Sequence, residues 1–275
     1  MRALVLSVNA VDAEVASDEL WSLGVVAIEE RSGAREGTIE LWTSLGEETD
    51  SITASVGALA HRWDFRFETV DEGVSETWRA HAAPTWISDD LVIYPAWAER
   101  PEGAADAGRL TAIAIEPGAT FGMGDHPTTV LSLRSLAAVV TAGARVLDVG
   151  CGSGVLAIAA CRLGASQAVA IDISPAAVPT TIHNAELNAV SEQIAVSTSS
   201  LAEVDDVFDV VVANILAPAL IDLAADLKRV LSPHGALVIS GILAERHDHV
   251  LDALRPLRVV HRADLDGWTA ITLRW

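Results

Sequence analysis

The feature that most constrains the fold is the run RVLDVGCGSGVLAIAA at residues 145–160. An apolar segment typical of a buried strand leads into Gly150, Gly152 and Gly154, and the apolar spacing after them predicts a helix. A glycine-rich turn between a strand and a helix is where doubly wound α/β folds hold a nucleotide. The run therefore predicts a doubly wound α/β domain with a ligand site at the carboxyl end of one strand.

The chain from Pro127 onward alternates between strand and helix patterns, which extends this prediction to the C-terminus. Helices are expected at residues 128–140, 154–164, 176–188 and 220–231, and strands at 145–150, 168–173, 194–200, 208–216 and 235–242. Strand segments such as VVVA and ALVI are continuously apolar, which is typical of a parallel sheet covered on both faces. Residues 259–275 instead predict an antiparallel hairpin that turns at Asp266 and Gly267.

The first seventy residues follow a different order of elements. Strand patterns lie at residues 2–10, 25–31, 37–45 and 64–70, and helical patterns lie at residues 12–24 and 49–63. The order βαββαβ predicts a small ferredoxin-like sheet with two helices on one face. We therefore expect a small α+β substrate-recognition domain at residues 1–72, a structured linker region at 73–116 and the doubly wound domain at 117–275.

Charge and cysteine content exclude several classes of function. The chain has 38 acidic and 18 basic residues, and such a surface repels phosphate backbones, so no direct contact with nucleic acid is expected. A basic protein partner would be attracted, although acidity also serves solubility alone. Cys151 and Cys161 have no metal-ligand spacing, so no metal site is expected. The sequence shows no membrane span or signal peptide, and we expect a cytoplasmic protein.

The spacing of the glycines distinguishes between two kinds of nucleotide. A dinucleotide fingerprint has the spacing G-x-G-x-x-G, whereas here the third glycine comes one residue early and Val155 occupies the expected position. Asp148, at the end of the strand, would place a carboxylate beside a pyrophosphate, which is unfavourable for NAD and favourable for a cation. A phosphate-free nucleoside that carries a sulfonium, S-adenosylmethionine, satisfies both observations.

Asp172 is the candidate that binds the ribose of this nucleoside. It ends the next predicted strand, 22 residues after Gly150, where an acid can accept hydrogen bonds from the two ribose hydroxyls. A lone aspartate at a strand end can also be a helix cap or a solvated charge. Because the glycine loop lies at the matching distance upstream, the ribose role is the favoured interpretation.

Four motifs together resemble a known family. They are FGMGDHPTT at 121–129, LDVGCGSGVLAIAA at 147–160, AIDISP at 170–175 and VVANIL at 211–216. They are similar to motifs of the methyltransferases that modify protein eleven of the large ribosomal subunit, from about residue 78 to the C-terminus and only weakly in the first seventy residues. The resemblance implies a class I, Rossmann-like methyltransferase that uses S-adenosylmethionine on lysine side-chain or N-terminal amines of a basic, lysine-rich ribosomal protein.

The resemblance also implies which residues touch the cofactor. Gly152 belongs to the glycine loop, and Phe121 would pack near the cofactor. Met123 stands where the family usually has a threonine, so this loop lacks a hydroxyl group that its relatives carry. The remaining contacts that the resemblance implies are Thr129, Gly150, Asp172 and Asn214.

No residue is singled out as a general base. His126 lies between an aspartate and a proline and is interpreted as a residue that orders its loop. Asn214 ends a strand beside the expected ligand crevice, where its carbonyl oxygen can orient an amine. Glutamine-modifying relatives carry Asn-Pro-Pro-Tyr at this place, so the Asn-Ile-Leu-Ala of this chain argues against an amide substrate.

Two other functions stay open on the residues alone. A small-molecule methyltransferase would carry the same cofactor motifs, with the N-terminal domain used for dimerisation or closure over the site. A non-catalytic assembly factor that binds S-adenosylmethionine would also carry them, because such motifs indicate binding rather than turnover.

Overall fold

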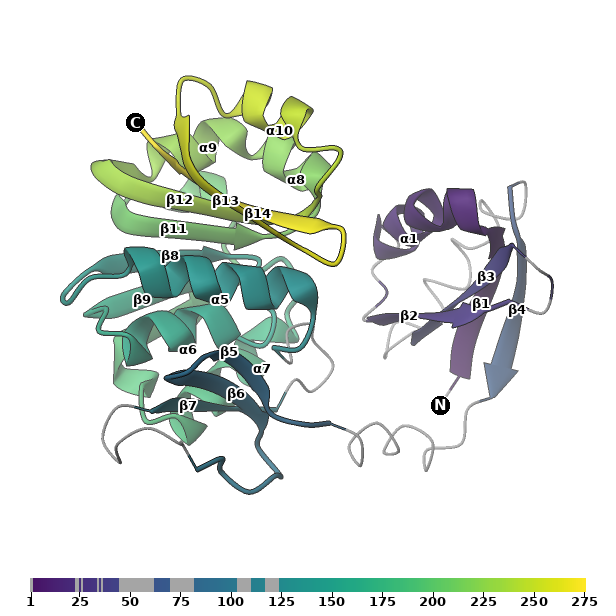
Figure 1. Ribbon diagram of the computed structural model, residues 1–275, viewed down its shortest axis with the longest axis horizontal. Coiled ribbons are helices and arrows are strands. Elements are labelled where there is room, and N and C mark those ends of the chain that lie inside the picture. Colours follow the sequence, from purple (N-terminus) through teal and green to yellow (C-terminus); the bar gives the residue numbers. More distant parts are fainter. Residues whose placement is uncertain are drawn as a thin grey trace. The chain divides into compact units, whose positions relative to one another are not determined.

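The computed structural model describes residues 2–22, 25, 27–33, 35, 37–44, 62–69, 82–102, 110–116 and 124–275. The chain divides into two compact units, Met1–Ala82 and Ala83–Trp275 (Figure 1). Within the described ranges, no helix is both long enough and apolar enough to cross a membrane.

The first unit is a four-stranded antiparallel sheet with a helix on one face. Its elements are β1 (Arg2–Asn9), α1 (Ala13–Ser22), β2 (Ala27–Ser32), β3 (Thr38–Ser44) and β4 (Asp64–Thr69), with a short 3-10 turn at Ala10–Asp12. The strand order β2-β3-β1-β4 confirms the ferredoxin-like prediction. Leu4, Leu6 and Val8 of the central strand share a buried cluster with Ala16 and Leu20 of α1. Residues 49–61 of the second predicted helix lie outside the described residues.

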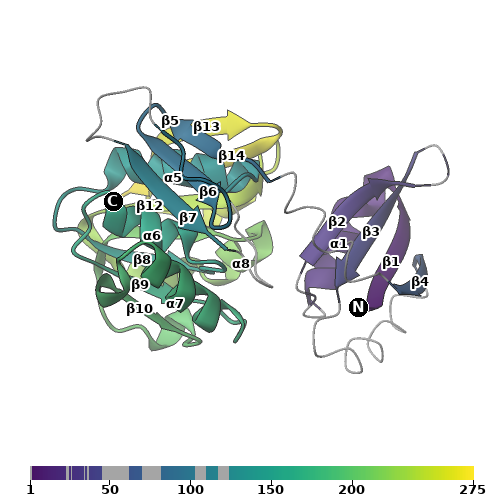
Figure 2. The same ribbon diagram turned by 90° about the horizontal axis from the view of Figure 1, so that it is seen from below.

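The second unit is built on a seven-stranded sheet (Figure 2). Its strands are β8 (Arg145–Val149), β9 (Gln167–Ile171), β10 (Ile194–Ser197), β11 (Phe208–Asn214), β12 (Leu231–Leu243), β13 (Arg258–Leu265) and β14 (Trp268–Arg274). They lie in the order β10-β9-β8-β11-β12-β14-β13, parallel except that β14 is antiparallel to both of its neighbours. Asp266 and Gly267 both have positive φ at the predicted hairpin turn, as a tight two-residue loop requires.

Helices cover both faces of this sheet, as predicted for a doubly wound fold. On one face lie α5 (Pro127–Val139), α6 (Val155–Arg162) and α7 (Ala177–Leu187), and on the other lie α8 (Ala217–Asp222), α9 (Ala224–Arg229) and α10 (Asp248–Ala253). The strands alternate accordingly, because Val146 and Val212 belong to the cluster on the α5 face and Leu147 and Val211 to the cluster on the α8 face.

The single helix expected at residues 220–231 is wrong. Two short helices, α8 and α9, meet there at Leu223, whose φ of −87° and ψ of 0° interrupt the regular helical turn. The apolar spacing continues across this break, since Leu220, Ala224 and Leu227 all reach the same buried cluster. For that reason the sequence pattern does not reveal the interruption.

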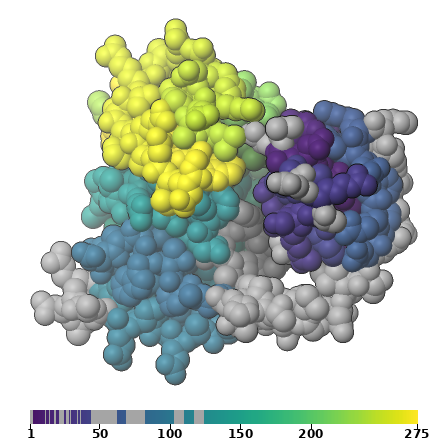
Figure 3. Space-filling model, turned by 45° about the vertical axis from the view of Figure 1, so that its right-hand side comes forward, coloured from purple at the N-terminus to yellow at the C-terminus, as the bar shows by residue number. Residues whose placement is uncertain are grey.

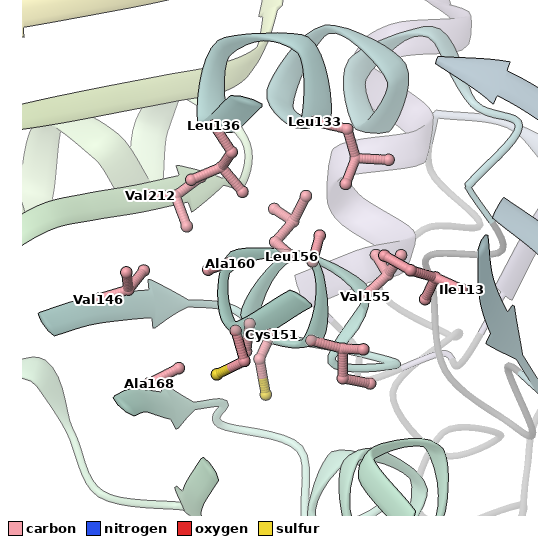
Figure 4. Packing of buried hydrophobic residues seen from close by; sticks show 14 of the residues in the cluster. Ile113, Leu133, Leu136, Val146, Cys151, Val155, Leu156, Ala160, Ala168 and Val212 are labelled. Carbon is pink, nitrogen blue, oxygen red and sulfur yellow. The ribbon is translucent and has the colours of Figure 1, made fainter. Parts of the chain in front are cut away.

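A three-stranded sheet lies over the helices of the α5 face. It consists of β5 (Thr85–Ser88), β6 (Leu91–Pro95) and β7 (Thr111–Ile115), all within the region 73–116, and belongs to the second unit. The patterns DDLVIYPAW at 89–97 and RLTAIAIEP at 109–117 predict β6 and β7, but no pattern predicts the four-residue β5. Helix α6 lies between the two sheets and is buried from Val155 through Cys161, as an apolar helix without an exposed stripe must be. Figure 4 shows Ile113 of β7 and Leu133 of α5 close to Val155 in this shared interior.

Two sets of contacts hold the C-terminal hairpin and the end of α10 in place. The C-terminal hairpin packs against α5, and in Figure 3 its yellow surface adjoins the teal surface of that part of the chain. Lys228 of α9 donates hydrogen bonds to the carbonyl oxygens of Ala253 and Arg255, both at 2.9 Å. These carbonyls lie at the C-terminal end of α10, where helical acceptors lack internal partners. Lys228 is the one lysine in the sequence.

Candidate functional site

The glycine loop joins β8 to α6 at the carboxyl end of the sheet. Gly150, Gly152 and Gly154 have φ of +77°, +54° and +79°, which are left-handed conformations that side chains disfavour. A Cβ atom at Gly150 would collide with Cγ2 of Ile215, and one at Gly154 would lie 2.7 Å from Cγ2 of Thr181. The loop therefore needs glycines to close on its own neighbours, before any ligand is considered.

Asp172 connects this loop to the end of β9. One carboxylate oxygen accepts the N–H of Gly152 at 2.8 Å, and the other accepts the N–H of Ser174 at 2.8 Å. The carbonyl oxygen of Ile171 accepts the N–H groups of Gly150 and Cys151 in addition. Each carboxylate oxygen has a second lone pair, so the partly exposed Asp172 can accept further hydrogen bonds beside the loop.

Asp148 lies beneath the loop and is completely buried. Its Oδ2 accepts the N–H of Ala157 in α6 at 3.0 Å, while its Oδ1 has no hydrogen-bond partner among the described residues. Burial, together with the smaller effect of the nearby charge of Asp172, raises the pKa of Asp148 to about 7, although the hydrogen bond from Ala157 lowers it in part. A carboxyl group in this state favours a positive group of a ligand and disfavours a phosphate.

Thr129 and Asn214 meet on the other side of the glycine loop. Asn214 ends β11, and its Nδ2 lies 3.5 Å from Oγ1 of the buried Thr129 in the first turn of α5. β8 and β11 are neighbours from which the chain continues in opposite directions across the sheet, and doubly wound folds bind ligands at such a point. Gly150 approaches Ile215, the residue after Asn214, so both groups of predicted residues lie where the neighbouring strands β8 and β11 end.

His126 is a capping residue of α5. Its Nδ1 accepts the N–H of Thr128 at 3.3 Å and lies 2.8 Å from the hydroxyl oxygen of the same residue. The ring also packs edge-on against Trp268 of β14, with centroids 5.4 Å apart. Burial lowers the pKa of His126, while the charge of Asp125 opposes this shift. These contacts agree with the interpretation that His126 orders its loop.

Sequence reasoning missed two residues beside the loop. Ile173 follows Asp172 and is 93% exposed, so an apolar surface adjoins the predicted ribose acid. The sequence placed Ile173 inside the strand predicted at 168–173, whereas β9 ends at Ile171, so the exposure of this side chain was not predicted. Asn184 of α7 is fully buried against the loop, but nothing in its local sequence distinguishes it from a polar residue on an exposed helix face.

Phe121 and Met123 lie outside the described residues, which begin again at Gly124. Among the residues that are described, no three His, Cys, Asp or Glu side chains gather in a way that could hold a metal ion.

The doubly wound sheet with an antiparallel β14, together with a glycine loop joined to an acid at the end of the next strand, defines an S-adenosylmethionine-dependent methyltransferase. Comparison with known families agrees: the model of the family described as ribosomal protein L11 methyltransferase (PrmA) matches residues 6–275. This chain belongs to that family. The match includes the first unit, where the motifs alone gave only a weak resemblance.

Individual relatives support the assignment. A ribosomal protein L11 methyltransferase of Symbiobacterium thermophilum is 38% identical, over 88% of this chain and 77% of the relative. One from Bordetella parapertussis is 37% identical and covers 98% of both chains. The crystal structure of ribosomal protein L11 methylase from Lactobacillus delbrueckii subsp. bulgaricus has a TM-score of 0.64 and 33% identity, and covers 70% of this chain and 97% of that one.

Proposed function

We propose that this enzyme transfers methyl groups from S-adenosylmethionine to lysine side-chain or N-terminal amines of ribosomal protein L11. The observation that carries the proposal is the family match from residue 6 to residue 275, which spans both compact units. A match limited to the second unit would support only the cofactor and the fold. The Bordetella parapertussis relative, which is named for this activity, likewise aligns over 98% of the chain.

Asp172 and Ile173 are proposed to hold the nucleoside part of the cofactor. Asp172 already accepts two backbone N–H groups at 2.8 Å, which fixes its carboxylate beside the loop and leaves one lone pair on each oxygen for a ribose hydroxyl. Hydrogen bonds to a charged acceptor contribute roughly 1.5–3 kcal/mol each. The exposed Ile173 offers an apolar surface of the kind that a flat purine ring can cover.

Asp148 is proposed to select a positive cofactor. Its buried Oδ1 has no hydrogen-bond partner in the described part of the chain, and its pKa of about 7 allows it to ionise when a cation is near. The ammonium and sulfonium groups of S-adenosylmethionine supply this charge. A pyrophosphate would instead raise the energy of a buried carboxylate.

Thr129 and Asn214 are proposed to orient the amine. Bound S-adenosylmethionine supplies an electrophilic methyl group, and in-line transfer depends on the position of the nucleophile. Thr129 Oγ1 accepts a hydrogen bond from Nδ2 of Asn214. This contact orients the side-chain amide so that its Oδ1 can accept an N–H of the incoming amine. A lysine amine has a pKa of about 10.4 in water, so it must lose a proton in the crevice before it attacks.

The first unit is proposed to recognise the protein substrate. Residues 1–82 contain 16 acidic residues and 6 arginines, a net charge of −10. Such a surface attracts a lysine-rich protein and orients it, over a screening length of about 8–10 Å at ordinary salt. We keep the proposed division of the chain into a recognition domain at residues 1–72, a structured linker region at 73–116 and a methyltransferase domain at 117–275. Strands β5, β6 and β7 of the linker region belong to the second compact unit.

The proposal is tested by incubating the chain with isotope-labelled S-adenosylmethionine and purified ribosomal protein L11. We expect label in L11, at lysine or N-terminal amines by mass spectrometry, and much less label at a limiting cofactor concentration when Asp172→Ala replaces the wild type. Label that appears only in small molecules of a cell extract would indicate a small-molecule methyltransferase. Binding of cofactor with no label in any acceptor would indicate a non-catalytic assembly factor.

A further inference from the structure

Two buried asparagines, Asn184 of α7 and Asn188 at the C-terminal cap of this helix, lie one helical turn apart and face the edge of β7. Asn184 is fully buried and Asn188 is 6% exposed. β7 is the last strand of its sheet, so within the described residues no strand lies on its second side. Its backbone groups on that side need other partners, because buried N–H and C=O groups are costly when left unpaired.

Each asparagine pairs with the backbone of β7 in the way a neighbouring strand would. Asn188 accepts the N–H of Ala114 at 2.9 Å and donates to the carbonyl of Ala114 at 2.7 Å. Asn184 accepts the N–H of Glu116 at 2.9 Å and donates to the carbonyl of Glu116 at 2.9 Å. Residues four apart on a helix and two apart on an extended chain are both separated by roughly 6–7 Å, so the two amides match Ala114 of β7 and Glu116, which directly follows the strand.

The two asparagines differ in their remaining hydrogen bond. Asn188 donates it to the carbonyl of Asn184, one turn back in its own helix, at 2.7 Å. Asn184 donates it to the carbonyl of Ser153, inside the glycine loop, at 2.9 Å. Thr181, also on α7, lies with its hydroxyl 3.3 Å from the carbonyl of Gly152. Of the two asparagines, Asn184 alone therefore connects the glycine loop to the end of β7.

We propose that Asn184 is a positioning residue for S-adenosylmethionine, which it never touches. It fixes the peptide between Ser153 and Gly154, and with it the left-handed turn that begins α6. A loop held in its binding conformation in the free enzyme binds without the cost of ordering. This inference rests on the proposed place of the cofactor at the glycine loop.

The test compares Asn184→Leu with Asn188→Leu in the full-length enzyme. Each variant loses an equivalent pair of backbone hydrogen bonds, to Glu116 in the first and to Ala114 in the second, and only Asn184→Leu loses the contact with Ser153. We expect Kd for S-adenosylhomocysteine, measured by calorimetry, to rise roughly tenfold in Asn184→Leu and to change less than twofold in Asn188→Leu. KM for S-adenosylmethionine should rise with Kd while kcat stays within a factor of about two.

Equal Kd values in the two variants, at a similar loss of Tm, would overturn the inference. If Asn184→Leu does not fold, amide hydrogen exchange of the wild type, measured by NMR, tests the same inference. Binding of S-adenosylhomocysteine should then slow exchange of the Glu116 N–H, which Asn184 holds, and not of the Ala114 N–H, because coupling between two sites is reciprocal. Unchanged exchange at Glu116 would contradict the inference. A wild type that binds no cofactor would contradict the proposed function instead.

Discussion

The carboxylate of Asp172 accepts the backbone N–H of Gly152 at 2.8 Å, so the candidate ribose acid and the glycine loop form one hydrogen-bonded unit. The contact joins residues that follow two neighbouring strands, β8 and β9. Given the proposed ribose role, a change at Asp172 would weaken cofactor binding in two ways, through the lost ribose contact and through the altered shape of the loop.

Asp172→Ala is expected to weaken S-adenosylmethionine binding by about ten- to a hundredfold, which corresponds to the loss of charge-assisted hydrogen bonds. Calorimetry gives the affinity, and circular dichroism checks that the fold is kept. Asp209→Ala is the matched control, because Asp209 also accepts a backbone N–H, that of Arg145 at 2.9 Å, but at the opposite end of β8. Affinity that is unchanged in Asp172→Ala would remove this residue from the site.

Asp148→Asn is expected to stabilise the protein at pH 8. The pKa of Asp148 is raised from 3.8 to about 7 in the folded state, so between these values the unfolded chain releases a proton that the folded chain retains. Wild-type stability should fall as pH rises through this window, by at most about 4 kcal/mol, and then level off. The advantage of the variant in urea unfolding should thus be small near pH 4 and largest above pH 7. An advantage that does not vary with pH would contradict the assignment.

The same Asp148→Asn variant is expected to bind S-adenosylmethionine less tightly, since it loses the negative charge that faces a cationic cofactor. Stability and affinity should therefore move in opposite directions at pH 8. Calorimetry at pH 8 measures the affinity of both proteins for S-adenosylmethionine. Tighter binding by the variant would show that the charge of Asp148 does not contribute to cofactor binding.

NAD is expected not to bind at this site, because the glycine spacing and the buried Asp148 both oppose a pyrophosphate. Fluorescence titration with NAD measures this directly. Saturable binding at micromolar concentration that S-adenosylmethionine displaces would show that the loop was misinterpreted.

Thr129→Val and Asn214→Ala are expected to lower kcat, and the double variant should lose less than the product of the two single effects. The reason is that Thr129 acts by orienting the amide of Asn214, with a coupling energy of about 0.5–1.5 kcal/mol. Steady-state assays of all four proteins give this value. Independent effects would mean that the 3.5 Å contact does not contribute to catalysis.

A fragment of residues 83–275 is expected to bind S-adenosylmethionine almost normally and to lose methylation of ribosomal protein L11. It retains the whole second unit, with Thr129, Asp148, Asp172 and Asn214, and lacks the acidic first unit. Calorimetry and the labelling assay measure the two properties separately. Undiminished methylation by the fragment would place substrate recognition in the second unit.

The strand–glycine loop–helix unit and the place of Asp172 beside it were predictable because their signals are local. Gly150, Gly152 and Asp172 lie within a strand-loop-helix-strand segment, and the spacing along the chain determines where these residues meet. The C-terminal hairpin was predictable for a similar reason, since Asp266 and Gly267 favour the positive φ that the turn requires.

The parts that escaped prediction depend on distant partners. Asn184 and Asn188 have the spacing of an ordinary polar helix face, and their partners on β7 lie about seventy residues earlier in the chain. The same holds for Asp148, whose charge indicated a cation but whose unpaired Oδ1 depends on how α6 packs over it. The sequence pattern does not indicate the break between α8 and α9 at Leu223. Apolar spacing shows which face of a helix is buried and does not show whether the helix is continuous.

Lys228 has a consequence for an enzyme proposed to methylate lysines. It is the sole lysine of the chain, the other 17 basic residues being arginines, and its ammonium group is committed to two carbonyl oxygens at the end of α10. Arginine side chains carry the remaining positive charge in a form that does not resemble an amine nucleophile. The enzyme therefore offers almost no competing acceptor to neighbouring copies of itself, and crowded molecules should leave one another unmodified.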